Sequence, residues 1–87
     1  MKKAAVEQIE RKIQTARDYG HINLRLRERM EELGLNRNQV ATAAGTRFEV
    51  IDKWCKGSVE RIDADILARL CYVLGCNVED IVTYEKD

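Results

Sequence analysis

The sequence predicts an all-α fold of five or six short helices. Proline is absent, and the glycines occur singly at positions 20, 34, 45, 57 and 75, which suits the ends of short helices. Between the glycines, apolar residues recur at three- and four-residue steps, and no segment sustains the alternation of a strand. The 87 residues, 45% hydrophobic and 34% charged, suffice for one folded domain with at most a short appendage.

Residues 1–21 form this appendage, which we predict to be an amphipathic helix preceding a domain of residues 22–87. Its apolar stripe is too narrow to be a core by itself. It must therefore cover either its own domain or the same helix of a second subunit. The residues of the stripe are Val6, Ile9, Ile13 and Ala16.

The second helix is expected to start at a cap on Asn23 and to stop at Gly34. Its apolar residues are spaced as one face of a helix requires. That face consists of Leu26, Met30 and Leu33.

Three signals agree on the start of a third helix, over residues 37–44. Asn36 can cap it, and Gln39 stands where a capping box returns the hydrogen bond. Leu35 and Val40 are placed to clasp across the cap as a hydrophobic staple. The inner face uses small apolar residues that let another helix approach closely, namely Val40, Ala41 and Ala44.

Gly45 interrupts what could have been one longer helix. A glycine can adopt positive φ, and a two-residue link after it lets the chain reverse into a second helix that crosses the first steeply. This next helix is expected to run through Lys56 and to stop at Gly57. Its inner stripe is Val50, Ile51 and Trp54, and its outer face carries Arg47, Phe48, Glu49, Asp52, Lys53 and Lys56.

Two further helices are expected to close the core. The first is capped by Asp63 and stops at Gly75, and the second is capped by Asn77 with acidic residues in its first turn. The apolar residues expected to be buried here are Leu67, Leu70, Cys71, Leu74, Ile81, Val82 and Tyr84.

Composition argues against a membrane protein, a metal site or an enzyme. No apolar run approaches the roughly 20 residues of a transmembrane helix and no signal peptide is visible, so we expect a cytoplasmic protein. The only histidine, His21, is far in sequence from Cys71 and Cys76, so packing explains these thiols better than zinc. No arrangement of nucleophile and base is apparent, and no cofactor is predicted.

Charge is divided unevenly along the chain although the formal net charge is zero. Residues 1–62 carry 13 Lys and Arg residues against 9 Asp and Glu residues, a net charge of +4. Residues 63–87 carry 2 against 6, a net charge of −4. One end of the molecule can therefore face phosphates.

The stretch GLNRNQVATAAGTRFEVIDKWCKG, residues 34–57, resembles the helix-turn-helix of phage-repressor and Cro-like transcriptional regulators, which belong to the XRE type. The following RIDADILARLCYVLGCNVEDIVTYE is similar to the two closing helices of small bacterial members. Residues 22–84 match this lambda-repressor-like five-helix domain, whereas residues 1–21 have no counterpart in it. The resemblance implies a repressor-like regulator that inserts the helix of residues 47–56 into the major groove of double-stranded DNA.

In that family, residues at the start of the reading helix and one turn along contact bases, which corresponds to Phe48, Glu49 and Lys53 here, with Asp52 at the margin. Lys53 can donate to guanine, Phe48 can pack on a thymine methyl, and Glu49 can accept from the cytosine amino group. Phe48 has an alternative role, packing on a neighbouring turn.

One position departs from the family pattern. Arg47 stands where the family usually has a capping Ser or Thr. Thr46 and Glu49 could form a capping box instead, which would start the helix one residue earlier and draw Glu49 away from bases.

A set of polar residues around the reading helix is expected to bind phosphates. Some stand at a helix start, where free amides and the dipole favour an anion, and others flank the far end of the reading helix. They are Asn36, Arg37, Arg47, Lys56 and Arg61.

The resemblance also favours a homodimer, because helix-turn-helix dimers read two-fold symmetric operators. We therefore favour the stripe of residues 1–21 as the dimer contact. A second class of function stays open: the same fold can serve as a protein-binding module, such as an antitoxin that masks a toxin, with DNA binding secondary.

Overall fold

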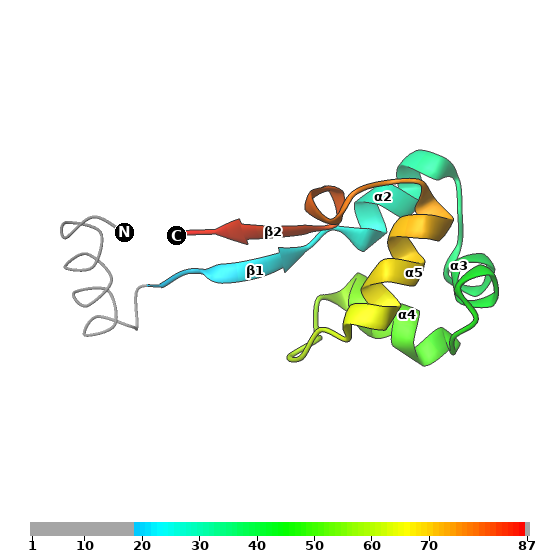
Figure 1. The fold of residues 1–87 in the computed structure, drawn as a ribbon, viewed down its shortest axis with the longest axis horizontal. Coiled ribbons are helices and arrows are strands. Elements are labelled where there is room, and N and C mark those ends of the chain that lie inside the picture. The colour runs from blue at the N-terminus through cyan, green and yellow to red at the C-terminus, as the bar shows by residue number, and fades with distance from the viewer. Residues whose placement is uncertain (1–18, 87) are drawn as a thin grey trace.

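The computed structural model describes residues 19–86, in which a bundle of short helices carries a two-stranded ribbon (Figure 1). The predicted stripe of Val6, Ile9, Ile13 and Ala16 lies outside the described residues. Within them the fold is mostly helical, with four α-helices rather than five. The elements are β1 (His21–Leu24), α2 (Leu26–Leu33), α3 (Arg37–Ala44), α4 (Phe48–Lys56), α5 (Ala64–Leu74), the 3₁₀-helix η2 (Val78–Asp80) and β2 (Val82–Glu85).

One core lies between the four helices and η2. Trp54 of α4 is buried in it, as the sequence predicted. The thiol of Cys55 is buried beside it, with its Sγ 3.6 Å from the Sδ of Met30. Leu33 was expected inside but is exposed at the end of α2. The buried residues are Leu26, Met30, Val40, Ala41, Ala44, Ile51, Trp54, Cys55, Leu70, Leu74 and Ile81.

The predicted start of α3 is confirmed. The side chain of Asn36 accepts a hydrogen bond from the backbone N–H of Gln39 at 2.8 Å, and the side chain of Gln39 accepts one from the N–H of Asn36 at 2.9 Å. This reciprocal capping box satisfies two amides that the helix leaves without partners. Leu35 packs against the core cluster that contains Val40.

The predicted break at Gly45 is a left-handed turn. Gly45 has φ +67° and ψ +35°, and the N–H of Thr46 donates to the carbonyl of Ala41 at 2.9 Å. Ala41 and Ala44 are both buried, so α3 can lie close to α4 and α5. The turn thereby sends the chain from α3 directly into α4.

The two ends of the domain form a sheet that the sequence analysis did not predict. Asn23 was expected to cap a helix, yet it lies in β1, and α2 begins three residues later. The expected last helix, after Asn77, is only the three-residue η2, and Tyr84 lies in the strand that follows it. Each strand has four residues and pairs with one about 60 residues away, so neither carries a local signal.

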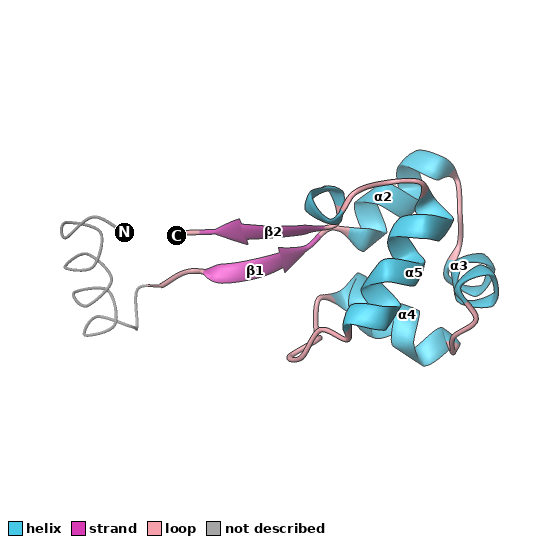
Figure 2. Cartoon of the chain, in the orientation of Figure 1, coloured by secondary structure: helices cyan, strands magenta, loops and turns pink. Residues whose placement is uncertain are grey.

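The ribbon of β1 and β2 is antiparallel and projects sideways from the helices (Figure 2). Ile22 pairs with Tyr84, and Leu24 pairs with Val82. Paired residues share a face, so these four form one apolar face of the ribbon. Leu24 and Val82 pack against the core.

We predict that Asn36→Ala lowers the free energy of unfolding by about 1 kcal/mol, because the first turn of α3 loses its cap. Denaturant unfolding followed by circular dichroism measures this. Asn38→Ala is the matched control, since Asn38 is an exposed asparagine two residues further along the same helix, and its cost should stay within about 0.5 kcal/mol. Equal losses in the two variants would contradict the capping role.

Candidate nucleic-acid interface

The helix that the sequence analysis assigned to DNA reading begins at Phe48, one residue later than predicted. Arg47 is its N-cap, with φ −86° and ψ 152°, and among residues 19–86 no side chain caps the first turn. The alternative capping box of Thr46 and Glu49 is therefore wrong. Glu49 stays exposed in the first turn, where the positive end of the helix dipole stabilises a carboxylate.

The outer face of α4 is solvent-exposed while its inner face is buried. Ile51 and Trp54 fix the helix in the core. On the opposite side, Phe48 is 42% exposed, and Glu49 and Lys53 are exposed as well. Charged and aromatic side chains are thus held on a rigid helix whose position is set by the core behind it.

Three of the predicted site residues meet in one ion-pair network. The Nη1 atom of Arg37, from α3, lies 2.8 Å from Oδ1 of Asp52, and the Nζ atom of Lys56 lies 2.8 Å from Oδ2 of the same carboxylate. Both carboxylate oxygens of Asp52 therefore face cations. The network joins the first turn of α3 to the last turn of α4.

The network keeps Asp52 ionised. The hydrogen bond from Lys56 is the main cause that holds the pKa of the Asp52 carboxyl below its usual value, and the charges of Lys56 and Arg37 add to it. Desolvation acts in the opposite direction. Together the three side chains carry a net charge of about +1, so the cluster still attracts an anion.

Phe48 lies beside residues of the α2–α3 connection. It shares a shallow groove of about 460 Å³ with Asn36 and Arg37, and the other lining residues include Met30 and Leu35. The structure thus brings the aromatic base-reading candidate next to two phosphate-binding candidates. At the other end of α4, Lys53 and Arg61 line a second groove of about 550 Å³, with Asp63.

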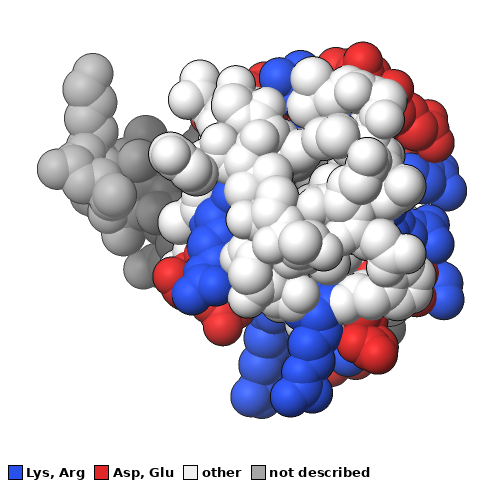
Figure 3. All heavy atoms as spheres, turned by 90° about the vertical axis from the view of Figure 1, so that its right-hand side faces the viewer, with Lys and Arg blue, Asp and Glu red and all other residues white. Residues whose placement is uncertain are grey.

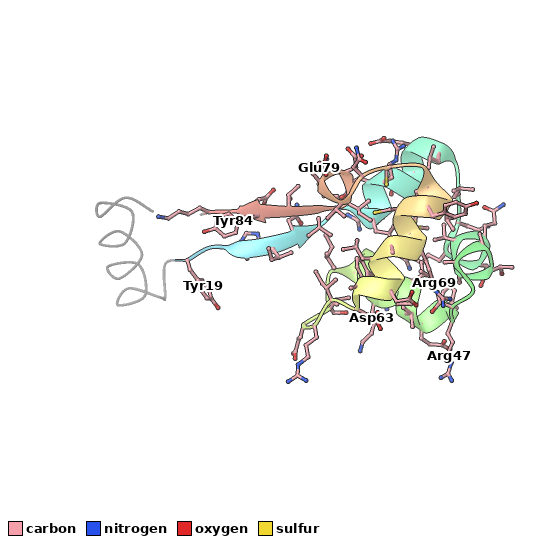
Figure 4. All side chains as sticks on the ribbon, viewed as in Figure 1. Tyr19, Arg47, Asp63, Arg69, Glu79 and Tyr84 are labelled. Carbon is pink, nitrogen blue, oxygen red and sulfur yellow. The ribbon has the colours of Figure 1, made fainter. Side chains whose placement is uncertain are left out.

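Arg47 points away from the helical body, at the end of α4 opposite the loop that follows it (Figure 4). On the side of the molecule shown in Figure 3, long basic side chains extend from the lower edge, and the centre is uncharged. In this view other Lys and Arg side chains lie at the periphery among Asp and Glu, and those at the lower edge project furthest from the surface. A local concentration of this kind attracts phosphates even when the net charge is zero.

Sequence reasoning missed Arg69, which holds the turn between α3 and α4. Its Nη1 atom donates to the carbonyl oxygens of Ala44 at 3.1 Å and Gly45 at 3.3 Å, while its Nε lies 3.0 Å from a carboxylate oxygen of Asp65 (Figure 4). These are carbonyls that the end of a helix leaves without intrahelical partners. The signal was present in the sequence, since Arg69 is the one basic residue of α5, four residues after Asp65.

The described residues form neither a membrane-spanning helix nor a cluster of metal ligands. In the part of the chain that the structure describes, no helix is both long enough and apolar enough to span a membrane. Within residues 19–86, no three His, Cys, Asp or Glu side chains are grouped as metal ligands. Cys71 and Cys76 are partly buried and pack against the core.

Comparison with known structures supports the fold. One crystal structure, described as a "putative DNA-binding protein from Bacteroides fragilis", superimposes with a TM-score of 0.65. The match covers 72% of this chain and 100% of the other, at 16% sequence identity. Identity at this level shows a shared fold and no more. A search of curated proteins finds no match.

Comparison with family models identifies the family of the chain. Residues 25–87 match the model of the Cro/C1-type HTH DNA-binding domain. This range contains α2 to β2, including the Gly45 turn and the exposed face of α4. The resemblance that residues 34–57 carry in the sequence is confirmed, and the chain belongs to the Cro/C1-type helix-turn-helix DNA-binding family.

Proposed function

We propose that this protein is a repressor-like transcriptional regulator that binds a specific operator by inserting α4 into the major groove. The observation that carries the proposal is the exposed outer face of α4, flanked by cations from α3 and from the loop after α4. A helix presented in this way fits the major groove, where base edges offer distinguishable donors and acceptors. Cytoplasmic residence, with access to DNA, belongs to the same proposal.

Lys53, Glu49 and Phe48 are the proposed base readers. Lys53 is exposed one turn into α4 and can donate to guanine acceptors. Because Thr46 and Glu49 form no capping box, the Glu49 carboxylate is available to accept a hydrogen bond from the amino group of cytosine. Phe48, which lines the same groove as Arg37, can pack on a thymine methyl.

Asp52 is proposed to act at the margin of base reading, mainly through its neighbours. Both of its oxygens face cations, so it positions Arg37 and Lys56 between α3 and α4. These two cations, together with three polar residues near the ends of α3 and α4, would bind the phosphates of the DNA backbone. The full set of proposed phosphate ligands is Asn36, Arg37, Arg47, Lys56 and Arg61.

The protein is proposed to bind its operator as a homodimer. A domain of this size makes few base contacts, and two copies on half-sites about 10 base pairs apart would double them. Residues 1–21 remain our proposed dimerisation element. His21 nevertheless belongs to β1, so the boundary between this element and the DNA-binding domain would fall within the ribbon.

We predict that Lys53→Ala relaxes base preference, whereas Arg37→Ala weakens binding to all sequences about equally. Loss of one phosphate contact should lower the slope of log K against log salt concentration by roughly one. Selection from random duplex DNA, followed by salt titration on the selected and scrambled sites, measures both effects. A changed base preference in Arg37→Ala with an unchanged salt slope would contradict the division of roles.

We further predict that Asp52→Asn strengthens binding to all duplexes and steepens their salt dependence. The substitution removes a negative charge from the interface and releases two cations for phosphates, which should raise the salt slope by up to about two. Glu32→Gln is the control, because Glu32 pairs with Arg29 on α2 at 3.2 Å, away from α4. Weaker binding by Asp52→Asn, with an unchanged slope, would show that Asp52 does not restrain the two cations.

A further inference from the structure

The apolar face of the β1–β2 ribbon continues beyond the core that it packs on. Near the helices, Leu24 and Val82 are partly buried against the core. Two residues further out on the same face, Ile22 is 54% exposed and its cross-strand neighbour Tyr84 is 61% exposed. Tyr19, just before the ribbon, is 71% exposed. Three large apolar side chains therefore occupy the outer end of the ribbon.

The opposite face of the ribbon is polar and makes its own contacts. Asn23 donates from Nδ2 to a carboxylate oxygen of Glu85 at 3.2 Å, and the Nε2 atom of His21 lies 3.5 Å from the other oxygen of Glu85. The two faces thus differ sharply in chemistry. A two-stranded ribbon is only marginally stable in water unless its apolar face packs on something.

The exposed end is held in a defined shape. The hydroxyl of Tyr84 donates a hydrogen bond to the backbone carbonyl of Tyr19. Gly20, at φ +86°, lies so close to β2 that a Cβ atom there would be 2.4 Å from the carbonyl oxygen of Glu85. Tyr19, Ile22 and Tyr84, with Val59 from the loop after α4, border a groove of about 650 Å³. We name these four residues the ribbon patch.

We propose that the ribbon patch is the contact through which a second copy of this chain completes the dimer. The ribbon projects sideways from the helices, whereas Arg47 points downward from α4 (Figures 1 and 4). A two-fold axis through the outer end of the ribbon, parallel to the direction of Arg47, therefore brings the second α4 to the same side of the molecule. An isologous contact of this kind presents two reading helices to one DNA duplex.

Continuity with the preceding segment supports the same occupant. The chain leaves the ribbon patch at Tyr19, directly after residues 1–18, whose sequence carries the apolar stripe of Val6, Ile9, Ile13 and Ala16. Stripe and patch are adjacent along the chain, so one two-fold contact can bury both. The placement of the two α4 helices on one DNA duplex rests on the proposed function. The assignment of the ribbon patch as the contact rests on the ribbon geometry alone.

The test uses sedimentation velocity of the full chain over a range of concentrations. Ile22→Ser and Tyr84→Ser should each raise the dimer dissociation constant at least about tenfold, because truncation of a central apolar side chain at an interface typically has this effect. Tyr84→Phe keeps the ring and should keep the dimer. Tyr72→Ser is the matched control, since Tyr72 is a tyrosine on α5 that is 89% exposed outside the patch.

DNA binding separates the failure of this inference from the failure of the proposed function. Duplexes selected with the wild-type protein are divided into half-sites and palindromes. Ile22→Ser and Tyr84→Ser should bind half-sites as the wild type does and lose the extra affinity for palindromes, with helical circular dichroism unchanged.

Two outcomes would overturn the inference: a wild-type chain that stays monomeric at all concentrations, or patch variants that dimerise as tightly as the wild type. Half-site binding in either case leaves the proposed base reading by α4 intact. If the wild type selects no DNA sequence and the patch variants still dissociate the dimer, the interface stands and the proposed function fails.

Discussion

The placement of α4 depends on the left-handed turn at Gly45. Positive φ at this residue ends α3 and reverses the chain, and Arg69 of α5 donates to the carbonyl oxygens of Ala44 and Gly45 that the turn exposes. A Cβ atom on Gly45 would lie 3.3 Å from the guanidinium of Arg69, so the glycine also leaves room for this contact. The same residues that join α3 to α4 thus tie the pair to α5. This junction therefore sets the position of α4 and of any DNA contact that α4 makes.

The ion pairs of Asp52 show how a chain with zero net charge can keep positive charge in one place. Asp52 does not cancel the cations around it, because one carboxylate is shared between Arg37 and Lys56. The two cations and the one carboxylate leave a net charge of about +1 at the junction of α3 and α4. Along the sequence, residues 1–62 carry a net charge of +4 and residues 63–87 a net charge of −4.

Sequence reasoning succeeded where the determinants are local. The capping box of Asn36 and Gln39, the cap at Asp63 and the helix-ending glycines each depend on residues a few positions apart. It failed at β1 and β2, because four-residue strands show their alternation only once they are paired. Tyr84 was therefore placed in the core although it lies exposed on the ribbon. The exposed face of α4 was predictable from helical periodicity. The pairing of Arg37 with Asp52 was not, because it depends on how α3 and α4 cross in space.

The pairing of β1 with β2 also holds the first and last elements of the domain together. His21 meets Glu85, so the chain between them is a loop whose two ends are fastened together. Fastening these ends must overcome the loop-closure entropy of about 60 residues, whereas the contacts among helices α2 to α5 join residues that are closer together in sequence. The ribbon is therefore the natural place for partial opening, while the helix-turn-helix stays assembled. Such a division would leave the helix-turn-helix rigid while the exposed end of the ribbon changes shape.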